Sequence, residues 1–396
     1  MMNDAKHVDE PNGVGSSRRA WSSAIALFTG SAIALLVLNF LFAGKSTDFA
    51  DAASMGAQTT SLFAKVDGHL IHGRDIHDAA DCLAGVEARK ATQSALWLGN
   101  SQLHAVNQWK EGETNSTPIL FDLLKKKQLD LITFSPPNAS LQEHYVLFEY
   151  LRRRIPLNIL IIGICFDDTR EIGLRPEIRA MADDLEVASA LAQTGIGRDL
   201  LAMPRAATGD QDTAGISHSL QERVEKSING YLSETSPLWQ ARLQARGELL
   251  NALYEMRNVA LGIKATTKRR VIRGRYQLNI SAIEAILNLA QQHGIRVLSY
   301  ITPIRHDVGI PYDPEEYRRF KDELAVISNR YGSALSNLED LVPAEYWGVK
   351  ASTSMNGSGE IDFMHFQAEG HRILASHLFR LITLPPVNGA PRTDSQ

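Results

Sequence analysis

Five short apolar runs, separated by longer and more polar stretches, constrain the fold of this chain more than any other feature. They cover residues 95–98, 129–134, 157–166, 296–302 and 333–338. Strands that are apolar on both sides are buried on both faces, and helices between them cover those faces. The sequence therefore predicts an α/β fold in which a parallel sheet forms the middle of a three-layer sandwich.

Helices are expected between and after these runs. One should follow the first strand and carry Leu103, Val106 and Trp109, and another should span about 141–154. Apolar residues over 373–381 have the spacing of a final packing helix.

The stretch between Asp168 and Gln292 is too long for an ordinary crossover between parallel strands. Its apolar residues have helical spacing over 185–191 and 238–259. We expect a helical insertion over about 175–290.

No charged residue lies between Arg19 and Lys45, which leaves 25 consecutive uncharged positions, residues 20–44. As a helix at about 1.5 Å per residue they span roughly 37 Å, enough to cross the ~30 Å hydrocarbon core of a bilayer. A cleaved signal peptide ending at Ala43-Gly44 is the alternative, although its apolar region is usually only about 7–15 residues long. We expect one transmembrane helix.

Positive side chains precede this helix at Lys6, Arg18 and Arg19, whereas Lys45 on its other side is followed by Asp48. The positive-inside rule then places the N-terminus in the cytoplasm. We expect a single-pass protein of the inner (cytoplasmic) membrane whose main domain is periplasmic or extracellular, in contact with the lipid bilayer only through this helix.

The chain divides into five segments on this interpretation: a cytoplasmic tail (1–19), the transmembrane helix (20–44), a linker (45–60), an α/β domain (61–384) and a disordered tail (385–396). The net charge of -4 argues against a nucleic-acid-binding protein, which needs a basic excess. Two cysteines form neither a disulfide framework nor a zinc site, so we expect no metal and no cofactor.

Gly99-Asn100-Ser101-Gln102 directly follows the first predicted strand. Ligands of open parallel sheets bind beyond the carboxyl ends of the strands, and Ser101 lies at such an end. A serine at the start of a helix has free backbone N–H groups nearby, which stabilise an oxyanion during acyl transfer. The alternative is that Ser101 only caps the helix.

Asp362-Phe363-Met364-His365 precedes the final helix. A spacing of three places both polar side chains on one side of a helical turn. Asp362 would then orient the imidazole of His365, which takes the proton of Ser101. The alternative is an ordinary surface turn between glycine-containing segments.

Together the two motifs resemble the SGNH (GDSL-type) hydrolase superfamily. Its nucleophile follows the first strand in a Gly-Asp-Ser motif, and its Asp-x-x-His precedes the last helix. The resemblance implies a flavodoxin-like three-layer fold with catalytic Ser101, Asp362 and His365. The N-terminal helix and the insertion resemble the membrane-anchored branch that includes the D-alanyl-lipoteichoic acid biosynthesis protein and related envelope O-acylation proteins.

The oxyanion hole departs from this pattern. Asn100 stands where the superfamily has an acidic residue, and no clear glycine follows the second strand, so Asn138 is the nearest candidate donor. In the third block Asp167 stands near the place of an amide, and a carboxyl group donates only when it is protonated. An ion-pair cluster of Asp167, Asp168 and Arg170 is an equally open interpretation.

Basic residues near the expected site are open to two interpretations. Arg305 follows the fourth strand and either binds an anionic or acyl-carrying substrate or is a solvated loop cation. A basic cluster either docks on anionic headgroups or an acidic polymer, or is an ordinary solvated surface. Its members are Lys264, Lys268, Arg269, Arg270, Arg273 and Arg275.

The resemblance therefore implies a membrane-anchored serine esterase or O-acyltransferase that acts on acyl esters, acetyl esters first, of cell-envelope polysaccharide. A transferase outside the membrane needs a donor delivered across the bilayer, and a multi-pass membrane-bound O-acyltransferase is the implied partner. The alternative is a catalytically degenerate module that binds polysaccharide or such a partner.

Overall fold

The computed structural model describes residues 59–203, 267–350 and 360–384. The predicted cytoplasmic tail, transmembrane helix and C-terminal tail lie outside the described residues, as does the apolar segment 238–259 and most of the linker. Across the three described ranges, no helix has the length and apolar character needed to cross a membrane.

The centre of the described chain is a six-stranded sheet in which every pairing is parallel. Its order is β10-β9-β8-β5-β7-β4. The strands are β4 (His72–Gly73), β5 (Ser94–Leu98), β7 (Asp130–Phe134), β8 (Leu157–Ile164), β9 (Arg296–Ile301) and β10 (Ala334–Asn337). The five predicted strands are thus confirmed, and β4 was missed because two residues are too few to form a pattern.

Apart from β4, the strand order is that of flavodoxin-like sheets. The chain begins in the middle with β5, adds β7 on one side, and then adds β8, β9 and β10 on the other. The order reverses between β5 and β8, and a crevice opens at the carboxyl ends of two strands that diverge in this way. This reversal lies directly at Ser101.

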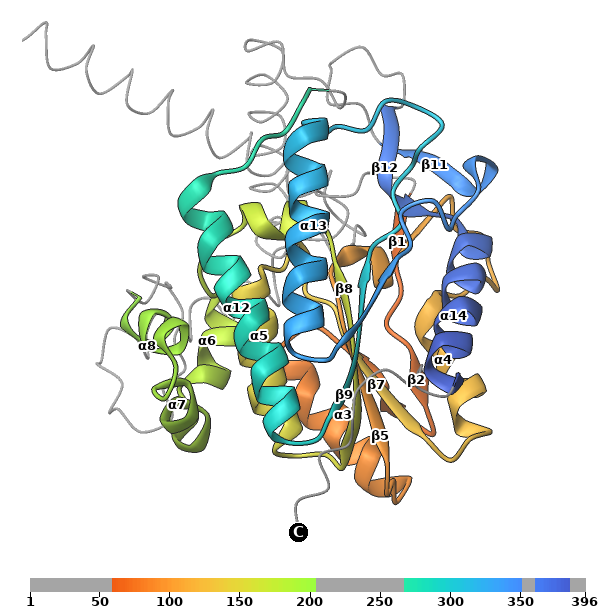
Figure 1. Cartoon of the computed structure of the whole chain (residues 1–396). Coiled ribbons are helices and arrows are strands. Elements are labelled where there is room, and N and C mark those ends of the chain that lie inside the picture. Colours follow the sequence, from red (N-terminus) through yellow and green to blue (C-terminus); the bar gives the residue numbers. More distant parts are fainter. Residues whose placement is uncertain (1–58, 204–266, 351–359, 385–396) are drawn as a thin grey trace, which may run out of the picture. The chain divides into compact units, whose positions relative to one another are not determined.

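Helices cover both faces of the sheet, as the sequence predicts (Figure 1). One face packs against α3 (Ile76–Ala88), α5 (Leu141–Arg152), α12 (Arg273–Gln292) and α13 (Pro314–Arg330), and the other against α4 (Ser116–Lys125) and α14 (Ala368–Thr383). Three short helices, α6 (Pro176–Ala182), α7 (Leu185–Leu191) and α8 (Gly195–Ala202), pack around α5 and α12.

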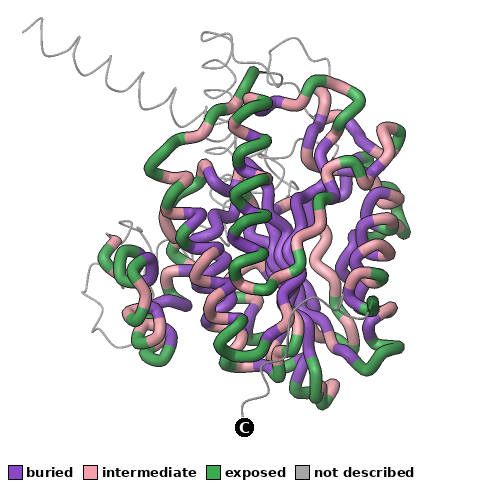
Figure 2. The backbone as a smooth tube through the Cα atoms, viewed as in Figure 1, coloured by how far each residue is buried: buried purple, intermediate pink, exposed green. Residues whose placement is uncertain are grey.

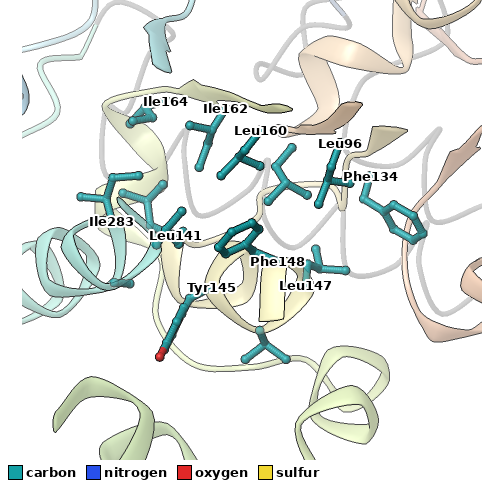
Figure 3. Packing of buried hydrophobic residues seen from close by; sticks show 14 of the residues in the cluster. Leu96, Phe134, Leu141, Tyr145, Leu147, Phe148, Leu160, Ile162, Ile164 and Ile283 are labelled. Atoms are coloured by element: carbon teal, nitrogen blue, oxygen red, sulfur yellow. The ribbon is translucent and has the colours of Figure 1, made fainter. Parts of the chain in front are cut away.

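Alternation along β5 shows how one strand serves both layers. Leu96 and Leu98 belong to the apolar cluster under α5 and α12, whereas Ala95 and Trp97 belong to the cluster under α4 and α14. Figure 3 shows the first cluster, where Phe148 of α5 lies toward the strand residues and Tyr145 points away from them. The middle of the sheet is buried and the edge strand β10 is partly exposed, while many of the other exposed residues lie on the outer sides of the helices (Figure 2).

Short elements complete the described chain. Three antiparallel pairs are β1 (Thr59–Ser61) with β6 (Ala105–Asn107), β2 (Lys65–Val66) with β3 (His69–Leu70), and β11 (Trp347–Lys350) with β12 (Glu360–Phe366). Single 3-10 turns are η1 (Ser101–Leu103), η2 (Asp167–Arg170) and η3 (Ala344–Tyr346).

The prediction of a helix directly after the first strand is wrong. The turn η1 ends at Leu103, and β6 then pairs with β1, which buries Val106 completely. Trp109 lies beyond β6 and is partly exposed. Apolar residues three apart fit a helix, but the strand partner lies more than 40 residues away, where local periodicity carries no information.

Candidate active site

The nucleophile candidate lies in a tight turn at the carboxyl end of β5. Asn100 caps this turn, because its Oδ1 accepts the backbone N–H of Gln102 at 3.0 Å. Gly99 is required by close packing, since a Cβ there would lie 2.6 Å from Leu103 Cδ1. The side chain of Ser101 is thereby presented beyond the end of the strand rather than in the core.

The Asp362–His365 segment is a bulged strand and not the helical turn that its spacing predicted. Val349 follows Trp347 by two positions on β11, whereas their partners on β12, Ile361 and Phe366, are five positions apart. The three extra residues form a bulge that brings Asp362 and His365 to the same side. In a regular strand, residues three apart would point to opposite faces.

The structure brings together the three side chains that the motifs suggested. Ser101 Oγ lies 2.9 Å from His365 Nε2, and His365 Nδ1 lies 3.0 Å from Asp362 Oδ2. A carboxylate can only accept, so His365 Nδ1 carries the proton and Nε2 is free to accept the hydroxyl proton of Ser101. This is the nucleophile–base–carboxylate arrangement of serine hydrolases.

Asp362 is held ionised although only 3% of its surface is exposed. Burial raises the pKa of its carboxyl group, but the charge and hydrogen bond of His365, together with the N–H groups of Met364 and His365, outweigh it and lower the pKa to about 2. The Nδ2 group of Asn107 adds a further donor to Oδ2 at 3.1 Å. The imidazole therefore faces a permanent negative charge.

A cavity of about 180 Å³ opens beside these three side chains. Its lining is mostly polar and comes from the ends of β5, β7 and β8, from β12 and from the segment before α12. The residues are Asn100, Ser101, Asn138, Cys165, Asp167, Asp168, Glu171, Arg269, Asp362, Phe363, Met364 and His365.

Asn138 lines the cavity in a left-handed conformation, with φ of +50°. Glycine is usual there, and asparagine is among the few other residues that tolerate it. Arg175 holds its loop, since it donates to Pro137 O at 2.8 Å and pairs with the buried carboxylate of Glu143. Within the described residues, the backbone N–H groups of Ser101 and Asn138 have no hydrogen-bond acceptor.

Asp167 lines the cavity as an ion-pair partner. It bonds to Arg269, accepts the hydroxyl of Tyr312 at 3.2 Å, and lies 3.7 Å from Arg170 Nε. The cluster interpretation is therefore observed for Asp167 and Arg170.

Asp168 instead bonds to the nucleophile turn, that is, Asn100 and the 3-10 turn η1 that carries Ser101. Its Oδ1 accepts from Asn100 Nδ2 at 2.9 Å and its Oδ2 accepts from the backbone N–H of Cys165 at 2.8 Å. Complete burial raises the pKa of this carboxyl group to about 7 despite both bonds. Asn100 is thus matched to Asp168, because a second carboxyl group at position 100 would add a buried like charge.

The structure does not bring Arg305 into the cavity lining. Its guanidinium pairs with Asp307 at 2.8 Å and donates to the carbonyl of Gly348 at 3.0 Å. Its backbone N–H bonds to Phe363 O, so this residue supports the loop beside β12. A substrate-binding role for Arg305 stays a prediction.

Several lining and supporting residues were not predicted from the sequence. Asn107 and Glu171 belong to no motif and reach the site only because distant segments fold together. Gln102 lies within the motif around Ser101, but its bonds to Pro303 and Met364 could not be predicted from the sequence. Arg269 was noticed only as part of a basic cluster. Among the described residues, no group of three or more acidic, histidine or cysteine side chains could hold a metal ion.

Comparisons with known proteins give similarity of structure alone. No family model and no curated protein matches the sequence. The chain is similar to a GDSL-like lipase from Bacteroides thetaiotaomicron, with 10% identity over 76% of this chain and 96% of that chain and a TM-score of 0.32. An acetylxylan esterase from Geobacillus stearothermophilus matches with 10% identity over 75% of this chain and 97% of that chain, at a TM-score of 0.33. Scores of this size carry no functional argument.

Proposed function

We propose that this protein is a serine esterase or O-acyltransferase in which Ser101 is the nucleophile, His365 the base and Asp362 the residue that orients it. One observation carries the proposal: Ser101, His365 and Asp362 form a continuous hydrogen-bonded chain beside a polar cavity. Those three groups at those distances are what acyl transfer through a serine ester requires.

The reaction begins when Ser101 Oγ attacks the carbonyl carbon of an ester and His365 Nε2 takes the hydroxyl proton. The imidazolium is stabilised by ionised Asp362. Collapse of the tetrahedral intermediate breaks the bond to the alcohol oxygen, which receives the proton from His365. The acyl group is then an ester of Ser101, and water or a sugar hydroxyl removes it by the same steps in reverse.

The tetrahedral oxyanion needs donors, and the N–H groups of Ser101 and Asn138 are the candidates in this chain. They replace the glycine N–H and side-chain amide that the SGNH resemblance implies. Asp168 is not such a donor in its ionised form, because both of its oxygens accept hydrogen bonds. Two backbone donors suffice in other serine enzymes.

The size and polarity of the cavity support a short acyl group. A volume of about 180 Å³, lined within the described residues by mainly polar side chains, favours a small acyl group over a long apolar chain. We propose acetyl esters of a cell-envelope polysaccharide as the substrate class, with the domain tethered outside the membrane by residues 20–44. For transfer, a multi-pass membrane-bound O-acyltransferase would supply the donor.

A fluorophosphonate probe tests the nucleophile directly. We expect covalent labelling of the folded protein that disappears in Ser101→Ala and persists in Ser116→Ala, which removes another histidine-bonded serine. Ser101→Ala should also lose hydrolysis of a small acetyl ester, and Ser116→Ala should keep it. A folded wild type that is not labelled and does not hydrolyse the ester would favour the binding module instead.

A further inference from the structure

We propose that Gln102 is a positioning residue that sets the distance between Ser101 and His365; this inference rests on the proposed function. Its side chain is 1% exposed. The Nε2 group donates to the carbonyl oxygen of Met364 at 2.8 Å and to that of Pro303 at 2.8 Å. One amide thus joins the nucleophile turn, the loop after β9 and the strand that carries the base.

The sheet itself does not determine where His365 lies relative to Ser101. Ser101 follows β5 in the central sheet, whereas His365 belongs to β12, which among the described residues pairs with β11 in a separate two-stranded sheet. The two residues are 264 positions apart in sequence. Their contact therefore depends on the packing of β12 and on the hydrogen bonds that it makes outside its own sheet, which include those of Gln102 and Asn107 and the backbone bond from Arg305 to Phe363.

Met364 is the residue through which Gln102 acts. Its backbone N–H donates to Asp362 Oδ1 at 2.9 Å, and its carbonyl oxygen accepts from Gln102. The peptide groups on both sides of Met364 are thus fixed, one from within the bulge and one from the nucleophile turn. His365 is the next residue, so the placement of the peptide group after Met364 determines where the His365 ring lies.

The chemistry of the glutamine fits this role better than a packing role. A primary amide offers two N–H donors, and both are used on main-chain carbonyls. Its Oε1 is buried without a partner within the described part of the chain. A leucine of similar size would fill the same space without an unpartnered oxygen, so packing alone does not explain an amide here.

Removal of the two donors should misplace the base more than it weakens substrate binding. We expect Gln102→Leu and the isosteric Gln102→Glu to lower kcat for a small acetyl ester about 100-fold, the loss typical of misplacement by about 1 Å. The KM should stay within about twofold, and the rate of fluorophosphonate labelling should fall in parallel with kcat.

Arg296 provides a matched control. It also donates to two main-chain carbonyls, those of Ile382 and Leu381, but it lies at the amino end of β9, whereas Ser101 lies beyond the carboxyl end of β5. Arg296→Met should lower the melting temperature and leave kcat unchanged. A wild-type kcat in either folded Gln102 variant would overturn the proposal, as would an equal loss of kcat in Arg296→Met.

A measurement on the histidine itself separates this proposal from the proposed function. With 15N-labelled histidine, NMR reports the His365 Nδ1–H···Asp362 bond, assigned by its loss in His365→Gln. We expect this signal to shift or broaden in Gln102→Leu and to be unchanged in Arg296→Met. If the wild type proves inactive on esters, the proposed function fails, while an unchanged signal in Gln102→Leu would independently refute the positioning role.

Discussion

Two of the serine–histidine hydrogen bonds in the described chain, Ser101–His365 and Ser116–His371, differ in almost every other respect. Ser101 Oγ lies 2.9 Å from His365 Nε2 beside the cavity. Ser116 Oγ lies 2.7 Å from His371 Nδ1, and both residues are fully buried at the contact of α4 with α14. In both cases the two partners are more than 250 residues apart in sequence.

The difference lies in what holds the second ring nitrogen. His365 Nδ1 donates to an ionised carboxylate, whereas His371 Nε2 donates to the neutral carbonyl of Ala105 at 3.1 Å. Burial lowers the pKa of His371 to about 3, so this ring stays neutral and cannot take a proton from Ser116 near neutral pH. A serine–histidine contact becomes a nucleophile–base pair only with a charge to stabilise the imidazolium and with access for a substrate.

The largest expected effect separates the two histidines. His365→Gln should lower kcat by about 10⁶-fold, the scale seen when a serine enzyme loses its base. His371→Gln should keep kcat per folded molecule and cost about 1–3 kcal/mol of unfolding free energy, because buried groups lose their partners. Ester hydrolysis measures kcat and urea unfolding measures the unfolding free energy of both variants. A strong loss of kcat in folded His371→Gln would contradict the distinction between the two histidines.

Replacement of the carboxylate by a neutral group makes the active pair resemble the buried one. Asp362→Asn should lower kcat by about 10⁴-fold, because an amide allows the wrong tautomer and does not stabilise the imidazolium. The fold should persist, because the amide oxygen can still accept the N–H groups of Met364 and His365. Asn107 Nδ2, which bonds to the other carboxylate oxygen, keeps the carbonyl of Val349 as an acceptor. Steady-state kinetics check this, and a loss below tenfold would show that the carboxylate is not needed.

The buried histidines should govern acid sensitivity. Burial lowers the pKa of His72, His144 and His371 to about 3, and it lowers the pKa of His104 well below its ordinary value. The unfolded chain binds protons at these rings near pH 6.5, so below that pH it binds more protons than the folded chain. Stability should therefore fall as pH falls from about 6.5 toward 3, by about 1.4 kcal/mol per pH unit for each ring. Asp168, whose pKa burial raises to about 7, binds a proton in the folded chain and offsets about one ring's share of this loss.

Asp362 does not contribute to this loss between pH 6.5 and 5. Its folded pKa of about 2 lies below the ordinary 3.8, so its stabilising effect is present above pH 3.8 and is lost as pH falls through about 2. Urea unfolding at pH 7, 6 and 5 measures the slope, which should be shallower in His371→Gln. A flat profile over this range would contradict the neutral state of the buried rings.

The smallest expected effect concerns the buried serine. Ser116→Ala removes one hydrogen bond to His371, although the backbone N–H of the same residue still donates to that ring at 3.2 Å. We expect a loss of about 1 kcal/mol in unfolding free energy and no change in kcat. Chemical denaturation beside an ester assay tests both parts, and reduced activity would mean that the second pair is linked to the site.

Local patterns predicted those parts of the molecule that depend on neighbours in sequence. The runs at 95–98 and 157–166 are strands because they are apolar on both sides, and the helix expected over about 141–154 is α5. The same reasoning failed after Ser101, where β6 replaces the expected helix, and at Asp362, where a bulged strand replaces the expected turn. In both places a distant strand partner overrides the local spacing.

The sequence by itself determined the layered α/β architecture, the place of Ser101 beyond a central strand, and the Asp362–His365 unit with its three-residue spacing. Only the tertiary structure decided which serine meets which histidine, that Asn100 is matched to Asp168, and that Gln102 reaches Met364. The physical reason is range: periodicity and capping act over a few residues, whereas these contacts join segments separated by 68 to 264 positions and form only when the helices and sheets have packed.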